Sequence, residues 1–245
     1  MNNLEHRIIP VLLLKGGGLY KGVNFDKYSY VGDPINAVKI FNEKEVDELV
    51  FFDIEASHMS KSPNIEKLEE VCGECFMPLS FGGGINSIEI IKKIISLGVE
   101  KVIINTAAVE DKGLIIEAVK YFGSSTITCC IDYKTDFFGK RKVYIRNGTE
   151  KTNLDPILWM EELQEIGVGE IILNSIDKDG TGKGYDLNYL KQLDKLHKTP
   201  IIISGGLNSK EDIKDAIKMG FTAMAGGSYF VYYGKRKAVL ITYDI

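Results

Sequence analysis

The chain has 245 residues, of which 44% are hydrophobic and 26% charged, values typical of one α/β barrel domain, so we expect residues 1–245 to form a single domain. Its 30 Lys and Arg against 34 Asp and Glu give a net charge of −4, which argues against a nucleic-acid-binding protein because such proteins usually carry a basic stripe. No apolar stretch approaches the length of a membrane span and the N-terminus lacks a signal-peptide pattern, so we expect a cytoplasmic location without membrane association.

Short β-branched apolar runs alternate along the chain with segments that carry apolar residues at helical spacing. Eight runs are candidate strands: residues 7–14, 48–54, 76–81, 101–105, 126–133, 170–175, 200–204 and 223–225. Most of them are apolar on both faces, which predicts an α/β fold with a closed parallel (β/α)8 TIM barrel. An open doubly wound sheet is the alternative.

Two segments are too long for simple strand-to-helix turns. Residues 15–30 are rich in glycine and aromatic residues, and VYIRNGTE at 143–150 predicts a small hairpin with Asn147-Gly148 as its turn. Long loops after barrel strands usually cover a substrate, so we expect residues 15–30 and 134–151 to lie at the catalytic face. The C-terminal FVYYGKRKAVLITYDI reads partly as strand.

Residues 78–98 and 200–220 are close copies, PLSFGGGINSIEIIKKIISLG and PIIISGGLNSKEDIKDAIKMG. Matching residues such as Gly83 and Gly205 are 122 positions apart, about half of the 245-residue chain. A half-length repeat of strand, Gly-Gly turn and helix predicts a barrel built from two similar half-barrels, which leaves no sheet edge unpaired.

The glycine pairs of this repeat are the first chemical signal. Gly83-Gly84 and Gly205-Gly206 each precede a helix that Asn-Ser opens, and backbone N–H groups at such a turn favour an anion. The simpler interpretation is a tight turn with an Asn or Ser cap. Two equivalent turns favour a substrate with a phosphate at each end, bound also by residues after the following strands: Asn105, Thr106, Gly227 and Ser228.

Segments spread over nearly the whole chain resemble one family. They are RIIPVLLLKGGGLYKGVNF at 7–25, GDP at 32–34, DELVFFDIEAS at 47–57, FGGGI at 81–85, KVIINTAAVE at 101–110, DKDGTGKGYDL at 177–187 and ISGG at 203–206. Together they resemble the HisF family, the cyclase subunits of imidazole glycerol phosphate synthase. The resemblance implies a barrel that receives ammonia from a glutaminase partner, the HisH subunit. It also implies that this ammonia is used to cleave and cyclise a bisphosphorylated ribonucleotide.

The resemblance implies two catalytic aspartates, one ending the first strand and one ending the fifth, as acid and base of the ring closure. Asp132 matches the second, but Leu13 occupies the first position, and the internal repeat aligns the same two positions. Because leucine cannot transfer a proton, a cyclase would need another group, for which Asp177 and Asp53 are the candidates. We expect Asp177 to face the chemistry together with Asp132. The resemblance also implies that Lys21 reaches the substrate from its loop.

Four charged residues open predicted strands and would ring the N-terminal mouth of the barrel: Arg7, Glu48, Lys101 and Glu170. Such a ring could be a solvated set of ion pairs that stabilises little. In HisF-like barrels the matching four residues form the gate through which ammonia enters, and all four match in type here. The resemblance therefore implies that ammonia passage is retained.

Leu13 and the short C-terminal segment resemble a divergent HisF-like branch linked to acetamidino-sugar formation in bacterial surface polysaccharides. We therefore expect first a subunit that receives ammonia from a HisH-like glutaminase and supports amidation of a nucleotide-linked sugar by a separate sugar amidotransferase. The alternative is a genuine imidazole glycerol phosphate synthase cyclase of histidine biosynthesis. A third hypothesis is a non-catalytic scaffold that only activates a glutaminase.

The four cysteines, Cys72, Cys75, Cys129 and Cys130, lack the spacing of a zinc site or a redox centre and are expected to be reduced thiols. No cluster of His, Asp and Glu has metal-ligand spacing. The sequence therefore predicts no catalytic metal and no cofactor.

Overall fold

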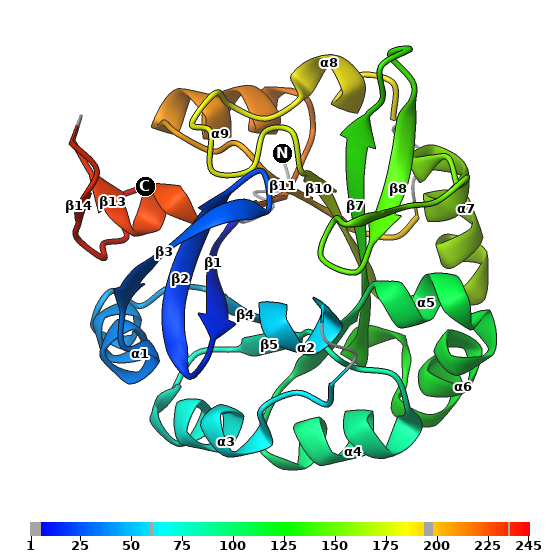
Figure 1. Cartoon of the computed structure of the whole chain (residues 1–245), viewed down its shortest axis with the longest axis horizontal. Helices are drawn as coiled ribbons and strands as arrows, with labels where there is room; N and C mark the ends of the chain where they lie inside the picture. Colours follow the sequence, from blue (N-terminus) through cyan, green and yellow to red (C-terminus); the bar gives the residue numbers. More distant parts are fainter. Residues whose placement is uncertain (1–5, 59–60, 194–197, 235) are drawn as a thin grey trace, which may run out of the picture.

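Eight parallel strands close into a barrel in the computed structural model, which describes residues 6–58, 61–193, 198–234 and 236–245 (Figure 1). The barrel strands are β1 (Arg7–Lys15), β4 (Leu49–Asp53), β5 (Leu79–Gly82), β6 (Lys101–Ile104), β7 (Ile127–Thr135), β10 (Glu170–Ser175), β11 (Ile201–Ser204) and β12 (Ala223–Gly226). Each pairs in parallel with the next in that order, and β12 pairs with β1 to close the ring. The predicted (β/α)8 TIM barrel is confirmed.

Helices alternate with the barrel strands along the chain, and all but the short α2 lie outside the ring of strands in Figure 1. They are α1 (Pro34–Glu43), α2 (Ile54–His58), α3 (Ile65–Glu74), α4 (Ile88–Ser96), α5 (Thr106–Glu110), α6 (Lys112–Phe122), α7 (Pro156–Ile166), α8 (Leu187–Leu190) and α9 (Lys210–Lys218). Two short 3-10 turns, Ser124–Thr126 and Ser228–Phe230, precede β7 and follow β12. No described helix combines the length and the apolar character needed to span a membrane.

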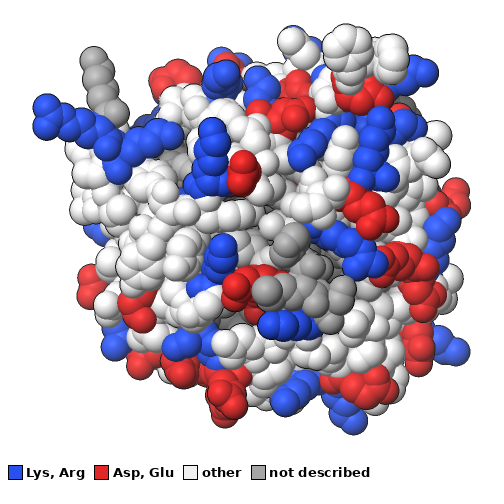
Figure 2. Space-filling model, viewed as in Figure 1, with Lys and Arg blue, Asp and Glu red and all other residues white. Residues whose placement is uncertain are grey.

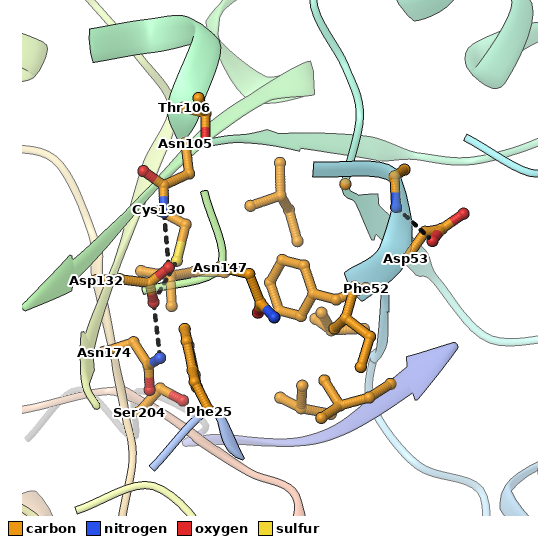
Figure 3. Close-up of a pocket in the computed structure, with 18 of the residues that line it drawn as sticks. Phe25, Phe52, Asp53, Asn105, Thr106, Cys130, Asp132, Asn147, Asn174 and Ser204 are labelled. Atoms are coloured by element: carbon orange, nitrogen blue, oxygen red, sulfur yellow. Dashed lines mark hydrogen bonds between the residues drawn. The ribbon is translucent and has the colours of Figure 1, made fainter. Parts of the chain in front are cut away.

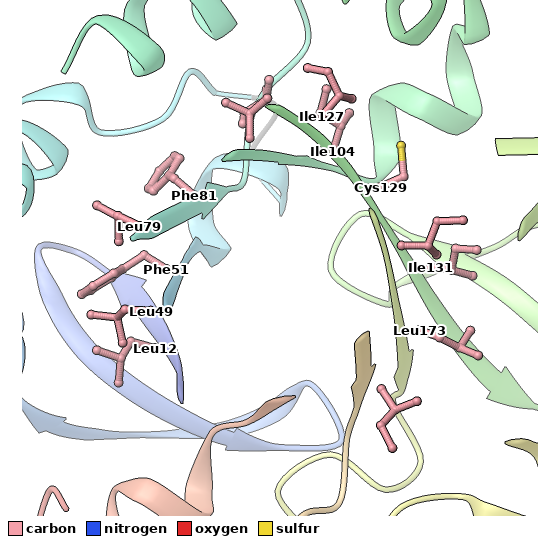
Figure 4. Close-up of a cluster of buried hydrophobic side chains, with 14 of the residues drawn as sticks. Leu12, Leu49, Phe51, Leu79, Phe81, Ile104, Ile127, Cys129, Ile131 and Leu173 are labelled. Carbon is pink, nitrogen blue, oxygen red and sulfur yellow. The ribbon is translucent and has the colours of Figure 1, made fainter. Parts of the chain in front are cut away.

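The side chains of each barrel strand alternate between two cores, because successive residues of a strand point to opposite faces. Outward-facing residues such as Leu12, Phe51 and Phe81 pack against the helices in the large cluster of Figure 4. Inward-facing residues form a second, smaller cluster: Ile9, Val50, Ile103, Cys130, Ile172, Ile202, Ala223 and Ala225. This inner cluster fills the middle of the barrel and leaves polar side chains to its two ends.

The two half-chain copies have the same helix starts. The side-chain oxygen of Ser87 accepts a hydrogen bond from the Ile90 backbone N–H at the start of α4. Ser209 does the same for Asp212 at the start of α9, where the Asp212 side chain completes a capping box. The repeat in the sequence is therefore a repeat in the structure.

The glycine pairs of the repeat are required by close packing. Gly83 and Gly205 have positive φ angles of 108° and 89°. A Cβ atom on Gly83 would lie 2.2 Å from the carbonyl oxygen of Asp53, and one on Gly205 would lie 2.4 Å from that of Ser175. Each turn thus rests on the end of the preceding barrel strand, a position that only glycine can occupy.

The long segments after β1 and β7 are hairpins. Residues predicted as a loop after β1 contain the antiparallel strands β2 (Gly18–Val23) and β3 (Asp26–Gly32), and β2 also pairs with β1. The predicted hairpin around Asn147-Gly148 is confirmed by β8 (Arg141–Ile145) and β9 (Glu150–Lys151), and β8 pairs in addition with β7. At the C-terminal end, β13 (Tyr232–Tyr233) and β14 (Ala238–Val239) form the expected short strands.

Candidate functional site

A cavity opens at the C-terminal ends of the barrel strands, the end that carries the active site in TIM barrels. Figure 3 shows Asp132 of β7 and Asp53 of β4 on opposite sides of this cavity, with Phe25 from the β2–β3 hairpin among the lining side chains. Figure 2 shows Lys and Arg interspersed with Asp and Glu around the centre of the face that is viewed there. The charge on this face is therefore of mixed sign.

Asp132 is held by side chains from three barrel strands or their ends and is only 7% exposed. The Nδ2 atoms of Asn105 and Asn174 donate to its two carboxylate oxygens, at 2.6 and 2.7 Å, and the thiol of Cys130 lies 3.6 Å from one of them. Burial raises the pKa of Asp132 to about 6, against the opposing effects of these hydrogen bonds and of the Lys134 charge. A carboxyl group with such a pKa can accept and donate protons near neutral pH.

Asp179 provides a second carboxylate in the same cavity, from the loop after β10. Burial raises the pKa of Asp179, the Lys21 charge opposes this shift, and the Asp132 charge adds to it. Lys21 is buried on β2, and its Nζ donates to the carbonyl oxygen of Val11. Burial lowers the pKa of Lys21, and the Asp179 charge opposes that shift. Two carboxyl groups and one amine therefore influence one another electrostatically.

The structure does not bring the other two predicted acidic residues into this arrangement. Asp177 is exposed and is not among the described residues that line the cavity, and its Oδ2 accepts the backbone N–H of Thr135 at 2.7 Å. Asp53 lines the cavity, but its carboxylate accepts three backbone N–H groups, those of Glu55, Ala56 and Asn64. Asp53 is thus committed to the start of α2 and to the N-cap residue of α3, and Asp179 lines the cavity where Asp177 was expected.

The two predicted phosphate cradles differ in how they reach the cavity. Four predicted residues line its first side: Gly83, Gly84, Asn105 and Thr106. On the second side Gly227 and Ser228 line it together with Ser204, whereas Gly205 and Gly206 are not among its described lining residues. The reason is local, because the loop after β10 covers the second pair: a Cβ on Gly206 would lie 2.2 Å from the carbonyl oxygen of Gly184.

Leu13 lines the cavity from near the end of β1. The internal repeat aligns its position with that of Asp132, so the first half-barrel has a hydrocarbon side chain where the second has a carboxyl group. The Cα of Leu13 pairs with Phe52 of β4 and Tyr20 of β2. Of these two neighbours Phe52 also lines the cavity, as do Val11 and Val50, so the Leu13 side of the cavity is apolar.

The four predicted gate residues form a closed ring of alternating charge at the N-terminal end of the barrel. Arg7 donates to Glu48 at 2.9 Å and also to Glu170, and Lys101 Nζ lies 3.3 Å from Glu48 and 2.8 Å from Glu170. Ser80 donates a further hydrogen bond to Glu48 at 2.8 Å. The inner hydrophobic cluster lies between this ring and the cavity.

Asn174, Ser204 and Asp179 line the cavity but were not among the predicted site residues. Ser204 is the last residue of β11 and Asn174 the penultimate residue of β10, and a polar residue at the end of a barrel strand was a usable signal. Asp179 lies two residues beyond Asp177 in the same Asp-Lys-Asp-Gly segment. Its signal is Gly180, which has a φ of 67° and whose Cβ would lie 2.1 Å from the Gly22 carbonyl oxygen. That close approach brings the Asp179 segment against the β2–β3 hairpin.

Comparisons with known proteins show the family of the chain. The family model "Histidine biosynthesis protein" matches residues 7–237. A Pseudomonas aeruginosa protein named "Putative imidazole glycerol phosphate synthase subunit hisF2" is 48% identical over 241 residues, which cover 98% of this chain and 96% of that protein. "Imidazole glycerol phosphate synthase subunit HisF" of Alkaliphilus metalliredigens is 37% identical over 232 residues, 95% of this chain and 92% of that protein. The chain therefore belongs to the histidine biosynthesis protein family, among its HisF-type barrels.

Proposed function

We propose that this chain is the cyclase subunit of an imidazole glycerol phosphate synthase. In this reaction ammonia and a bisphosphorylated ribonucleotide give imidazole glycerol phosphate and an aminoimidazole nucleotide. The names of the relatives support this alternative over the sugar amidation that was expected first, because those reported above name imidazole glycerol phosphate synthase subunits. The observation that carries the proposal is the presence of Asp132 and Asp179 in one cavity.

Two carboxyl groups suit a ring closure that needs protons moved at two places. Asp132 would be one proton-transfer group, because its pKa of about 6 keeps it ready to exchange protons at neutral pH. Asp179 would be the other, in place of an acid at Leu13, since burial raises its pKa and it is close enough to Asp132 for their charges to interact. The buried amine of Lys21 would keep Asp179 partly ionised and would face an anionic substrate.

The phosphates of the substrate would lie at the two sides of the cavity. One side offers the turn of Gly83 and Gly84 with the start of α5 at Thr106, and the other offers Gly227 and Ser228. Lys21 lies at the second side, since a Cβ atom on Gly227 would be only 2.5 Å from the Lys21 Nζ. A positive charge next to a backbone turn favours a phosphate group.

The ring of Arg7, Glu48, Lys101 and Glu170 would admit ammonia from a HisH-like glutaminase docked at the N-terminal face. The inner hydrophobic cluster beyond the ring is suited to a small neutral molecule, because ammonium would lose hydration there. Subunit names among the relatives support the existence of a partner.

A second candidate function is favoured by Leu13. Without an acid at the end of β1, the barrel could pass ammonia onward to a separate amidotransferase that acts on a nucleotide-linked sugar. The two candidates differ in one respect: only the first requires the chain to turn over the bisphosphorylated ribonucleotide.

The deciding experiment is a cyclase assay with ammonium salt and the bisphosphorylated ribonucleotide, on the native chain and on Leu13→Asp. We expect turnover by the native chain, with a change of less than about tenfold in the variant, because Asp179 already supplies the second carboxyl group. No turnover by the native chain, with turnover appearing in Leu13→Asp, would overturn the proposal and favour sugar amidation.

The ammonia entrance has its own test in Lys101→Ala, measured in complex with the glutaminase partner. Removing Lys101 breaks its contacts with both Glu48 and Glu170, so the ring loses half of its cations. We expect more free ammonia released per product formed from glutamine, with the ammonium-supported rate unchanged. Lys218→Ala is the matched control, because that lysine forms an exposed ion pair with Asp215 on α9. Equal ammonia release by both variants would show that the ring is only a set of ion pairs.

A further inference from the structure

Asn105 occupies the N-cap position of α5 without capping it. Asparagine is a preferred N-cap residue because its side-chain oxygen accepts a backbone N–H of the first helical turn. Here φ and ψ are −125° and −82°, and the side chain makes no cap hydrogen bond. Its Nδ2 instead donates to Oδ2 of Asp132 at 2.6 Å. The Asn105 side chain is therefore used for Asp132 rather than for the helix.

Asn174 holds the same carboxylate from the other side. It lies on β10 directly opposite Asp132 in the parallel pairing of β7 with β10, and it is 8% exposed. Its Nδ2 donates to Oδ1 of Asp132 at 2.7 Å. Figure 3 shows the two amides on either side of Asp132, with a dashed hydrogen bond from each.

This arrangement leaves two polar atoms without partners. The Oδ1 atoms of Asn105 and Asn174 are buried and have no hydrogen-bond partner among the described residues. On the Asn174 side this oxygen faces backbone, since a Cβ on Gly205 would lie 3.0 Å from it. Unpaired buried acceptors destabilise a fold, and an apolar side chain of similar size would fill the same space without them. Packing alone therefore does not account for the two asparagines.

We propose that Asn105 and Asn174 are positioning residues, an amide clamp that holds the Asp132 carboxylate in one orientation towards the cavity as a proton acceptor. Each amide directs two N–H donors at most and uses one for Asp132, so the clamp favours the ionised carboxylate over the neutral acid. The catalytic meaning of the clamp rests on the proposed role of Asp132, whereas its effect on Asp132 itself does not.

Other groups also act on Asp132 and must stay constant in a test. Cys130 and Lys134 belong to its own strand, and Asp179 faces it from the loop after β10. Tyr28 of β3 is within range of the Asp132 charge as well. Substitutions at the two asparagines leave all four of these groups in place.

The experiment is a titration of Asp132 by carbon NMR on protein labelled at the aspartate carboxyl groups, without substrate. The Asp132 signal is assigned by its loss in Asp132→Asn. We expect a native midpoint at about 6. In Asn174→Leu and in Asn105→Leu the midpoint should rise by about one unit, a tenfold change in proton affinity, because each removes one donor to the carboxylate. The double variant should shift further than either.

Thr128→Val is the matched control. Thr128 is a buried residue of β7 whose hydroxyl has no partner among the described residues and does not contact Asp132. Its substitution should leave the Asp132 midpoint unchanged.

An unshifted midpoint in a folded Asn174→Leu protein would overturn the clamp. If that variant does not fold, Asn174→Val replaces it, because valine suits a strand and has no hydrogen-bond donor. An unshifted midpoint there overturns the clamp equally. Failure of the cyclase assay leaves the titration result standing, so the clamp and the proposed function fail independently. Where turnover is measurable, the acid limb of the rate profile should move with the midpoint.

Discussion

Replacing Asp132 by asparagine is expected to lower the ammonium-supported rate of imidazole formation by about 10²–10⁴-fold, the usual loss on removing a general acid or base. The amide keeps the shape of the side chain but cannot exchange a proton. The measurement is kcat and kcat/KM with saturating ammonium salt, with the thermal unfolding midpoint as a check on folding. Rates within about tenfold of native would remove Asp132 from the chemistry.

The pH dependence of the native rate provides a second test of Asp132 as a proton-transfer group. The pKa of Asp132 is raised from its ordinary value to about 6, so a base at this position is ionised above that pH and protonated below it. The rate should therefore fall as the pH decreases through about 6. A profile that stays flat down to the ordinary pKa of aspartate, near 3.8, would contradict the role of base.

The second large effect is expected from Asp179→Asn, measured beside Asp177→Asn. Asp179 lines the cavity and is the carboxylate whose charge acts on buried Lys21, so its loss should lower kcat by about 10²-fold or more. Asp177 is exposed and accepts one backbone N–H, which the amide oxygen of asparagine can also accept. The Asp177 variant should therefore keep nearly native kcat.

The paired design separates a proton-transfer role from a general effect of removing charge. Both variants remove one aspartate from the same short loop, and both keep the size of the side chain. Losses of equal size in the two variants would count against Asp179 as the second proton-transfer group. A loss only in Asp177→Asn would return the role to the residue that the sequence had indicated first.

Several parts of this protein could be predicted because they depend only on the order of residue types along the chain. Strand and helix periodicity indicated the barrel, since each strand must be apolar on the faces that it buries. The half-length repeat placed Gly83 and Gly205 in equivalent turns, and Leu13 opposite Asp132. The charged residues that open four strands were placed together because parallel strands begin at the same end of a barrel.

The loop after β10 could not be predicted in the same way. Both aspartates of Asp177-Lys178-Asp179-Gly180 follow the same strand, and nothing in the neighbouring sequence indicates which of them reaches the cavity. The Asp179 backbone N–H bonds to the Ser175 carbonyl oxygen at 3.0 Å and closes a turn that leaves Asp177 exposed. The β2–β3 hairpin then holds this turn, because Asn24 donates its backbone N–H to the Asp179 carbonyl oxygen at 2.9 Å.

The sequence by itself determined the barrel, its two-fold internal repeat, the family and the position of Asp132, because periodicity, repeats and motif spacing are visible in the order of residues without knowledge of their contacts. Only the tertiary structure decided which second acid reaches the cavity and how Asp132 is held. Those outcomes depend on contacts between segments far apart in the chain, such as Asn105 and Asn174 with Asp132, or Asn24 with Asp179. A side chain is positioned by all of the elements packed around it, and the closure of the barrel is what brings those elements together.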